Sequence, residues 1–382
     1  MKNHFTAPED EDPMAVTSCS LERVSAELPQ RVRGTSTALA DHTTFRLGGP
    51  AKRLVRATTD DELVDAVHEA DRVGEPILVL SGGSNVLISD QGFDGTVVLV
   101  DTHGLDAEVS DCGGAFVRVK AGEVWDDVVA YSIEQEWAGI EALSGIPGLV
   151  GATPIQNVGA YGQDVSQTVA RVRTWDRLTG GYATFTWDQC GFGYRDSLFK
   201  ASRAPHAATG RYVVVETWFQ FRLASLSEPV RYAQLAERLG VQLGARVPAS
   251  QVRAAVLELR AGKGMVLDAH DHDTWSAGSF FTNPMVDPAV ADRLPAQAPR
   301  FVQPDGRIKT SAAWLIEQAG FPKGYPGSGP ARLSSKHVLA LTNQGGAAAA
   351  DVVLLARQVR EGVRQRFGIE LVPEPVLVGL EI

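Results

Sequence analysis

The chain has 382 residues, about two and a half times a typical domain of roughly 150 residues, so the sequence predicts two or three packed domains. Hydrophobic residues at 44% and charged residues at 21% are typical of soluble globular proteins, which excludes a disordered or coiled-coil chain. The net charge of -10 argues against nucleic acid or an anionic membrane surface as a partner.

The charge is uneven along the chain. Residues 35–223 carry 15 basic and 25 acidic groups, whereas residues 224–382 carry 17 and 15, so the final segment is the one that favours an anion. The N-terminus lacks a signal pattern, and no apolar run approaches the roughly 18 to 20 residues that span a bilayer. We therefore expect a cytoplasmic protein without membrane insertion.

The first 34 residues begin with the acidic run 9–12 and show no sustained periodicity, so we expect most of residues 1–34 to form a flexible, solvated extension. A first subdomain follows at residues 35–108. Thr59 to Glu62 match a capping box for a helix that ends at Gly74. Strands are predicted at residues 76–80 and 96–100, with the loop Ser81-Gly82-Gly83-Ser84-Asn85 after the first.

Residues 109–223 form the second predicted subdomain, in which short strands dominate. We expect strands at 116–120, 171–175, 182–186 and 212–221, and a helix at 125–136. Between them, residues 144–162 are too glycine-rich for a stable helix and too long for an ordinary turn. The class predicted is α+β.

Residues 224–382 are predicted to form a separate α/β domain. Ser250 and Asp351 are expected N-caps of two helices, and Gly368 is expected to end the second. Strand candidates lie at 338–342 and 376–380.

Two glycine-rich loops, at 81–85 and within 144–162, could bring backbone N–H groups close to a pyrophosphate. A pair of tight turns explains either loop equally well when it is considered alone. No GxGxxG follows the first strand and no P-loop motif occurs, which excludes the usual nucleotide-binding motifs.

Isolated polar residues are open to two interpretations. Arg195 could be a surface arginine, and Ser279 could be a packed serine or a proton donor in a dry site. Glu374 lies between two prolines that restrict its backbone, although an exposed strand-end glutamate fits as well. Lys263 belongs to a basic set that could be solvated or could bind an anion, and His337 could be a substrate contact or a histidine with its hydrogen bonds satisfied inside the protein.

Taken together, these motifs resemble the UDP-N-acetylenolpyruvoylglucosamine reductase (MurB) family. The resemblance extends over about residues 36–382 and rests on residues 81–87, 146–148, 156–162, 194–197 and 278–284, with weaker support at 314–316, 336–337 and 373–374. It implies two subdomains that bind FAD non-covalently and a C-terminal substrate-binding domain. It assigns to FAD the residues Ser81, Gly82, Gly83, Ser84, Asn85, Ser144, Ile146, Pro147, Gly148, Gly151, Asn157, Gly159, Ala160 and Tyr161.

The resemblance also implies the reaction. In the family, NADPH reduces the flavin and leaves, and UDP-N-acetylglucosamine enolpyruvate then accepts hydride at C3 and a proton at C2, which gives UDP-N-acetylmuramate for peptidoglycan. Ser279 matches the proton donor, and Arg195 and Glu374 match residues that hold and polarise the substrate carboxylate. The UDP-sugar contacts implied are Tyr194, Lys263, Asn283, His337 and Tyr232, the last as in the larger, type I class. No metal is implied.

Two other functions remain open from the residues alone. One is an oxidase of the same flavin-binding architecture, which would pass electrons to oxygen. The other is a non-catalytic nucleotide-sugar binder, which would carry no flavin. The set Ser279, Arg195 and Glu374 favours the reductase, because all three candidate catalytic positions are intact.

Overall fold

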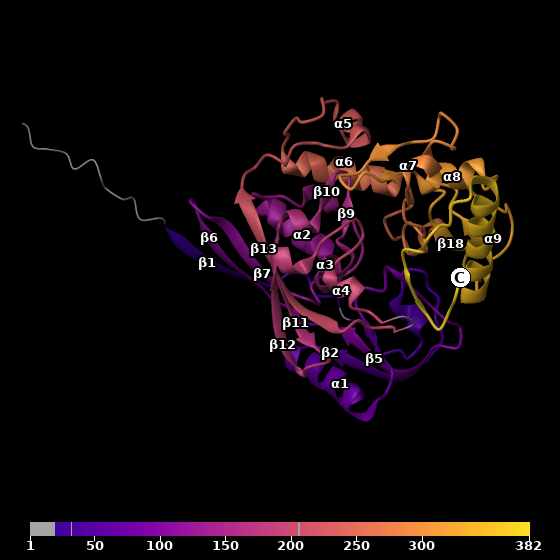
Figure 1. Ribbon diagram of the computed structural model, residues 1–382. Coiled ribbons are helices and arrows are strands. Elements are labelled where there is room, and N and C mark those ends of the chain that lie inside the picture. Colours follow the sequence, from indigo (N-terminus) through magenta and orange to yellow (C-terminus); the bar gives the residue numbers. More distant parts are fainter. Residues whose placement is uncertain (1–19, 32, 205–206) are drawn as a thin grey trace, which may run out of the picture.

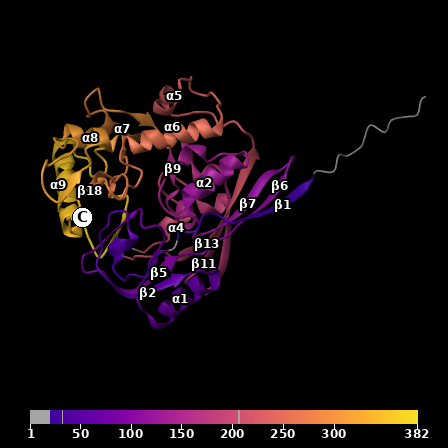
Figure 2. The same cartoon turned by 180° about the vertical axis from the view of Figure 1, so that it is seen from behind.

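The computed structural model describes residues 20–31, 33–204 and 207–382 (Figure 1). Helix α9 (Ala349–Phe367) lies at the opposite end of the molecule from strands β1 (Leu21–Ala26) and β6 (Leu105–Ser110), as the reverse view in Figure 2 also shows. Within the described ranges, no helix is both long and apolar enough to cross a membrane.

The first subdomain is a parallel three-stranded sheet packed against one helix. Its strand order is β2 (Ala51–Ala57), β5 (Phe93–Val100), β3 (Ile77–Leu80), and α1 (Asp60–Val73) buries Leu63, Val67 and Ala70 against it. The predicted caps are confirmed: the Thr59 hydroxyl accepts from the Glu62 N–H at 3.2 Å, and Gly74 ends the helix at φ 69°. The capping box differs in one respect, because the Glu62 carboxylate accepts from the Thr58 N–H, one residue earlier than predicted.

The second subdomain is built on a seven-stranded antiparallel sheet. Its order is β1, β6, β7 (Gly114–Lys120), β13 (Tyr212–Leu223), β11 (Val169–Asp176), β12 (Gly181–Thr186), and β8 (Trp137–Ala138) pairs with the end of β13. Helix α2 (Trp125–Glu134) packs on the sheet through Trp125, whose ring lies 5.9 Å from that of Phe219. The long segment 144–162 contains short helical turns, including α3 (Thr153–Gln156), and the strand β9 (Gly159–Ala160), which pairs with β10 (Gln163–Asp164).

Two sequence-based predictions need correction here. The expected extension at 1–34 is wrong for residues 21–26, because they form β1 and pair along their whole length with β6; residues 1–19 lie outside the described ranges. The boundary predicted after residue 108 falls inside β6, which belongs entirely to the large sheet. Both errors arise because these strands mix polar and apolar residues, so their place is fixed by the strands they pair with and not by their own pattern.

The C-terminal region consists of helices and small sheets. Helices α5 (Ala233–Leu239) and α6 (Ala249–Ala261) pack on Ala142 of the second subdomain. The region also contains α7 (Pro288–Ala291), α8 (Ala312–Gln318), β14 (Met285–Val286), β15 (Phe301–Val302), β16 (Ile308–Lys309), β17 (Ala331–Leu333) and β18 (Leu341–Asn343). The short helix α4 (Leu198–Ala201) lies before this region in the chain. The core formed by the elements after α6 also contains Phe45, Leu47 and Leu87, so the first subdomain and this part of the C-terminal region share one hydrophobic core.

The N-caps predicted for this region are wrong. Helix α6 begins at Ala249 after Pro248, which places Ser250 within the first turn. Helix α9 begins at Ala349, and the Asp351 carboxylate instead accepts from the Ala348 N–H at 2.8 Å, as an acidic residue in a first turn can.

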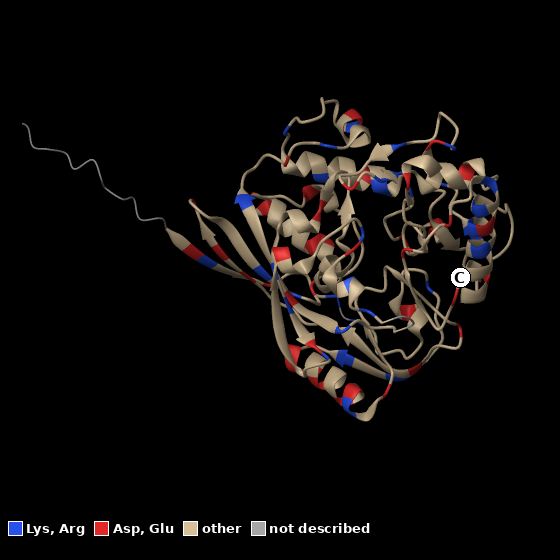
Figure 3. Ribbon diagram, viewed as in Figure 1, with Lys and Arg blue, Asp and Glu red and all other residues tan. Residues whose placement is uncertain are grey.

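Charge follows this division of the chain. In Figure 3, acidic residues gather on α1 and basic residues along α9, whose arginines are Arg357, Arg360, Arg364 and Arg366. The two helices lie far from each other, at the outer surface of the regions to which they belong.

The last strand returns to the first subdomain. β19 (Val376–Val378) pairs in parallel with β4 (Val86–Ile88), the strand that directly follows the loop 81–85. The Val376 N–H donates to the Asn85 carbonyl at 3.0 Å, which fixes the preceding Glu374 beside that loop.

Candidate active site

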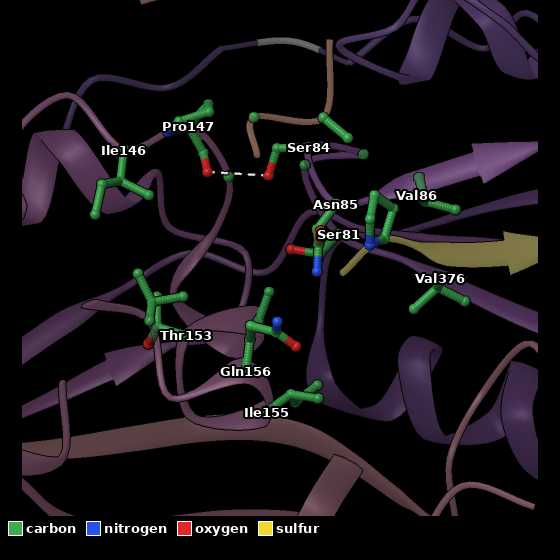
Figure 4. A pocket seen from close by; sticks show the side chains of 18 of the residues that line it. Ser81, Ser84, Asn85, Val86, Ile146, Pro147, Thr153, Ile155, Gln156 and Val376 are labelled. Carbon is green, nitrogen blue, oxygen red and sulfur yellow. Dashed lines mark hydrogen bonds between the residues drawn. The ribbon is translucent and has the colours of Figure 1, made fainter. Parts of the chain in front are cut away.

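The candidate site is a cavity of about 530 Å³ where all three regions meet. Segments from all three regions line it, including residues 78–86, 146–149, 151–153, 158–161, 276–279 and 373–376. Figure 4 shows Ser81, Ser84 and Asn85 on one side of this pocket and Ile146, Pro147, Thr153 and Gln156 on the other. The fold therefore brings together glycine-rich loops that are more than sixty residues apart in sequence.

The two loops touch through their glycines. A Cβ added to Gly82 would lie 2.6 Å from the Gly148 Cα, and one added to Gly83, at φ 61°, would lie 1.9 Å from the His42 carbonyl oxygen. The Ser84 hydroxyl donates to the Pro147 carbonyl at 3.0 Å across the same contact (Figure 4). These positions require glycine because the backbones approach closely, so the loops are not simply independent turns.

The first loop offers free hydrogen-bond donors. In the described part of the chain, the backbone N–H groups of Gly82, Gly83 and Ser84 donate to no protein acceptor, and the buried Ser81 hydroxyl has no partner. Such N–H groups in a glycine-rich turn suit phosphate oxygens. These residues therefore fit the diphosphate of FAD, the group that the sequence resemblance implies.

Arg195, Gln156 and Glu374 converge on the cavity wall. The Glu374 Oε1 lies 2.9 Å from the Arg195 Nε and accepts from the Gln156 Nε2 at 3.2 Å. The Arg195 contact is an ion pair without hydrogen-bond alignment, because the Nε–H finds no aligned acceptor. The arginine is held by its Nη2, which donates to the Gly159 carbonyl at 2.9 Å, and by the Lys200 ammonium, which donates to the Arg195 carbonyl at 2.7 Å.

Arg195 has a left-handed backbone, at φ 55°. Non-glycine residues rarely adopt this region and do so where the surroundings enforce it. Here the enforcing groups are Asn157, whose amide donates to the Gly193 carbonyl at 2.9 Å, and Ser197, which caps α4 and donates to the Ile155 carbonyl at 2.7 Å.

Ser279 belongs to the C-terminal region and lines the same cavity. The preceding Gly278 has φ 72°, and the Phe280 N–H donates to the Leu339 carbonyl at 2.7 Å. The Glu374 N–H donates to the Phe280 carbonyl at 2.8 Å, which sets the segments carrying Ser279 and Glu374 side by side. Both Phe280 and Phe281 are fully buried, so this backbone is firmly anchored.

An aromatic and basic group lines the cavity near α6. The Tyr161 and Tyr232 rings meet edge to face at 5.5 Å, and the Lys263 ammonium lies 5.3 Å from the Tyr161 ring centre. Burial lowers the pKa of Lys263, with a further contribution from the Arg260 charge. Burial also lowers the pKa of Arg260 to about 10, which leaves it protonated at neutral pH. This wall of the cavity is positively charged.

Five of the predicted residues do not line the cavity: Ser144, Asn157, Tyr194, Asn283 and His337. Ser144 is buried and donates to the Glu141 carbonyl, and Asn157 supports the Arg195 loop as described above. The Tyr194 hydroxyl accepts from the Asn283 N–H at 3.4 Å, which joins those two residues outside the lining. Their assigned roles stay predictions.

Three residues that line the cavity were not among the predicted site residues: Gln156, Lys200 and Arg260. Gln156 stands in the glycine-rich segment 144–162, and Lys200 and Arg260 lie on α4 and α6, where a cation is usually solvated. Their positions follow from tertiary contacts. Across the described ranges, no cluster of His, Cys, Asp and Glu could hold a metal ion.

Comparison with known proteins identifies similar chains. A family model described as "UDP-N-acetylenolpyruvoylglucosamine reductase, C-terminal domain" matches residues 270–378, and one described as "FAD binding domain" matches residues 51–184. The UDP-N-acetylenolpyruvoylglucosamine reductase of Cutibacterium acnes is 59% identical over 98% of this chain and 98% of its own length. That of Salinispora arenicola is 54% identical over 89% of this chain and 94% of its length. The crystal structure of the enzyme from Thermus caldophilus shares the fold, with a TM-score of 0.59, 24% identity, and coverage of 94% of this chain and 99% of that one.

Proposed function

This chain belongs to the UDP-N-acetylenolpyruvoylglucosamine reductase family, and from that premise we propose its reaction. It reduces UDP-N-acetylglucosamine enolpyruvate to UDP-N-acetylmuramate, a step of peptidoglycan precursor synthesis, with FAD as cofactor and NADPH as hydride donor. Its partners are these small molecules, and we propose the cytoplasm as its location.

One observation carries this proposal. A single cavity is lined by both glycine-rich loops and by Arg195, Ser279 and Glu374, although these residues come from three distant parts of the chain. A cofactor site and a set of groups suited to a carboxylate substrate therefore share one space. A nucleotide-sugar binder without chemistry would not need Ser279 and the Arg195–Glu374 pair to face the flavin loops.

FAD bound in this cavity supplies two-electron hydride chemistry. The chain would hold its diphosphate with the N–H groups of Gly82, Gly83 and Ser84. These donors are backbone groups, so the site binds an anion without a basic surface. That agrees with the acidic balance of residues 35–223.

Arg195 and Glu374 would hold the substrate carboxylate. The guanidinium fork of Arg195 suits a carboxylate; its Nη2 is held by the Gly159 carbonyl, and its Nε lies 2.9 Å from the Glu374 Oε1. The Glu374 Oε1 is occupied by Arg195 and Gln156, and its Oε2 could meet a substrate carboxylate only through a shared proton or a bridging donor, because two carboxylates repel each other. An enolpyruvyl carboxylate held in this way withdraws electron density from the adjacent C2 carbon.

Ser279 would give the proton to C2 of the substrate. A serine hydroxyl is a weak acid, so this role requires a fixed position, exclusion of water and nearby stabilising charge. The buried backbone at Phe280 and Phe281 provides the fixed position, and Arg195 in the same cavity provides positive charge. The basic wall formed by Lys263 and Arg260, together with Tyr232, suits the UDP moiety.

An anaerobic two-step experiment tests the proposal. NADPH is added to the purified flavoprotein until its absorbance near 450 nm is bleached, and UDP-N-acetylglucosamine enolpyruvate is then added without oxygen. We expect the flavin absorbance to return in proportion to the substrate. A flavin that stays reduced until oxygen enters would support an oxidase instead, and a protein that binds no flavin would support a nucleotide-sugar binder.

A further inference from the structure

The segment before the first subdomain runs from the large sheet to the start of the loop 81–85. After β1 pairs with β6, Leu28 is buried in the core of the large sheet at 7% exposure. The Arg31 guanidinium then pairs with Asp127 at 3.1 Å, and Arg33 reaches the first subdomain. We call residues 21–31 and 33 the N-terminal arm.

Arg33 binds three backbone carbonyls. Its Nη2 donates to the Ser81 oxygen at 2.7 Å, and its Nη1 donates to the Leu80 oxygen at 3.2 Å and the Val100 oxygen at 3.1 Å. Leu80 and Val100 are the last residues of β3 and β5, and Ser81 is the first residue of the glycine-rich loop. One guanidinium thus joins the ends of two parallel strands to the start of the loop.

The charge of Arg33 is not matched by a direct carboxylate partner. Within the described ranges it contacts only carbonyl oxygens, while the nearby buried Asp101 pairs with Arg56. Burial lowers the pKa of Arg33 to about 10, which still leaves the guanidinium protonated at neutral pH. Strand-end carbonyls carry partial negative charge that opposes a bound anion, and a cation that binds them reduces this opposition.

We propose that Arg33 is a positioning residue for the cofactor diphosphate: it fixes Ser81, and through it the donors of the loop 81–85, and it offsets the strand-end carbonyls behind that loop. This inference rests on the proposed FAD site. It assigns a role in cofactor binding to a segment that the sequence suggested was a solvated extension.

In the experiment, FAD is titrated into the apoprotein of the wild type and of four variants, and binding is followed by the quenching of flavin fluorescence. Arg33→Ala should weaken FAD binding about tenfold or more, the equivalent of about 1.4 kcal/mol. Arg33→Gln, which keeps donors but not the charge, should fall between wild type and Arg33→Ala, and Arg33→Lys should recover part of the loss. Arg31→Ala, the matched control on the same arm, should stay within about twofold, because Arg31 is 68% exposed and pairs only at the surface.

A second measurement separates positioning from general stability. In variants saturated with FAD, the ³¹P resonances of the two diphosphate phosphorus atoms should shift in Arg33→Ala and Arg33→Gln but not in Arg31→Ala. If Arg33→Ala does not fold, Arg33→Gln and Arg33→Lys are compared with wild type by FAD affinity and ³¹P shifts, and these two measurements test the role of Arg33. Unchanged affinity and unchanged ³¹P shifts would overturn the inference while leaving the FAD site intact. A wild-type protein that binds no FAD would instead overturn the proposed function.

Discussion

Replacing Gly82 with alanine tests whether the direct contact of the two glycine-rich loops shapes the cofactor site. The added Cβ would lie 2.6 Å from the Gly148 Cα and 3.2 Å from the Gly148 carbonyl carbon. Carbon atoms prefer separations of about 3.5 Å or more, so one loop must move by roughly 0.9 Å. Gly82 has an ordinary backbone conformation, so this substitution is purely steric.

The expected cost follows from that displacement. Forcing one extra carbon into a packed site costs about 1 to 3 kcal/mol, which as lost FAD affinity is about 5- to 150-fold. FAD affinity would be measured by fluorescence titration of the apoprotein, and apoprotein stability by thermal unfolding. Gly346→Ala is the matched control, because nothing lies within 4 Å of its added Cβ.

We expect Gly82→Ala to weaken FAD binding while Gly346→Ala leaves it unchanged. The unfolding temperature of the apoprotein distinguishes a local effect on the FAD site from a general loss of stability. If Gly82→Ala binds FAD with wild-type affinity and unfolds at the wild-type temperature, the two loops do not pack as described, and the account of the cofactor site fails.

Three further predictions concern the substrate groups and a half-buried histidine. Ser279→Ala should leave flavin reduction by NADPH close to wild type and slow reoxidation by substrate by about 10² to 10⁴; in rapid-mixing experiments, equal losses in both half-reactions would contradict the proton-donor role. Arg195→Lys should slow reoxidation by roughly tenfold or more, since an ammonium lacks the fork geometry, and wild-type turnover would exclude Arg195 from substrate binding. Burial, with the charges of Lys263 and Lys323, lowers the pKa of His337 from 6.5 to about 4. The unfolded chain therefore takes up this proton first, and the free energy of unfolding should decrease as the pH falls from 6.5 toward 4. His337→Gln should reduce that decrease in denaturant titrations, and an NMR titration midpoint near 6.5 would refute the shift.

Local patterns predicted the parts of the fold that local chemistry decides. Thr59 and Gly74 delimit α1 because a hydroxyl cap and a left-handed glycine act within one turn. The loop 81–85 was recognisable because its glycines stand where backbones must approach. Ser250 was misplaced as an N-cap, because Pro248 and the packing of α6 decide where that helix begins.

The rest depended on partners that are remote in sequence. The acceptors of Arg33 lie 47, 48 and 67 residues further along the chain, so no local pattern could identify its role. Gln156 and Glu374 are 218 residues apart and meet only because β19 returns to β4. Arg195, Ser279 and Glu374 were named because of a resemblance to a family, and the cavity now gives the physical reason for considering them together.

The pairing of β19 with β4 has a consequence for the order in which the site can form during synthesis. Strand β4 is synthesised nearly three hundred residues before its partner β19, so the edge of β4 that pairs with β19 stays unpaired until almost the whole chain has been made. Glu374 reaches the cavity by the same late pairing. The glycine loops are therefore synthesised long before the strand that completes the substrate carboxylate site. The cavity that they line together with residues 276–279 and 373–376 is complete only after this last strand has paired.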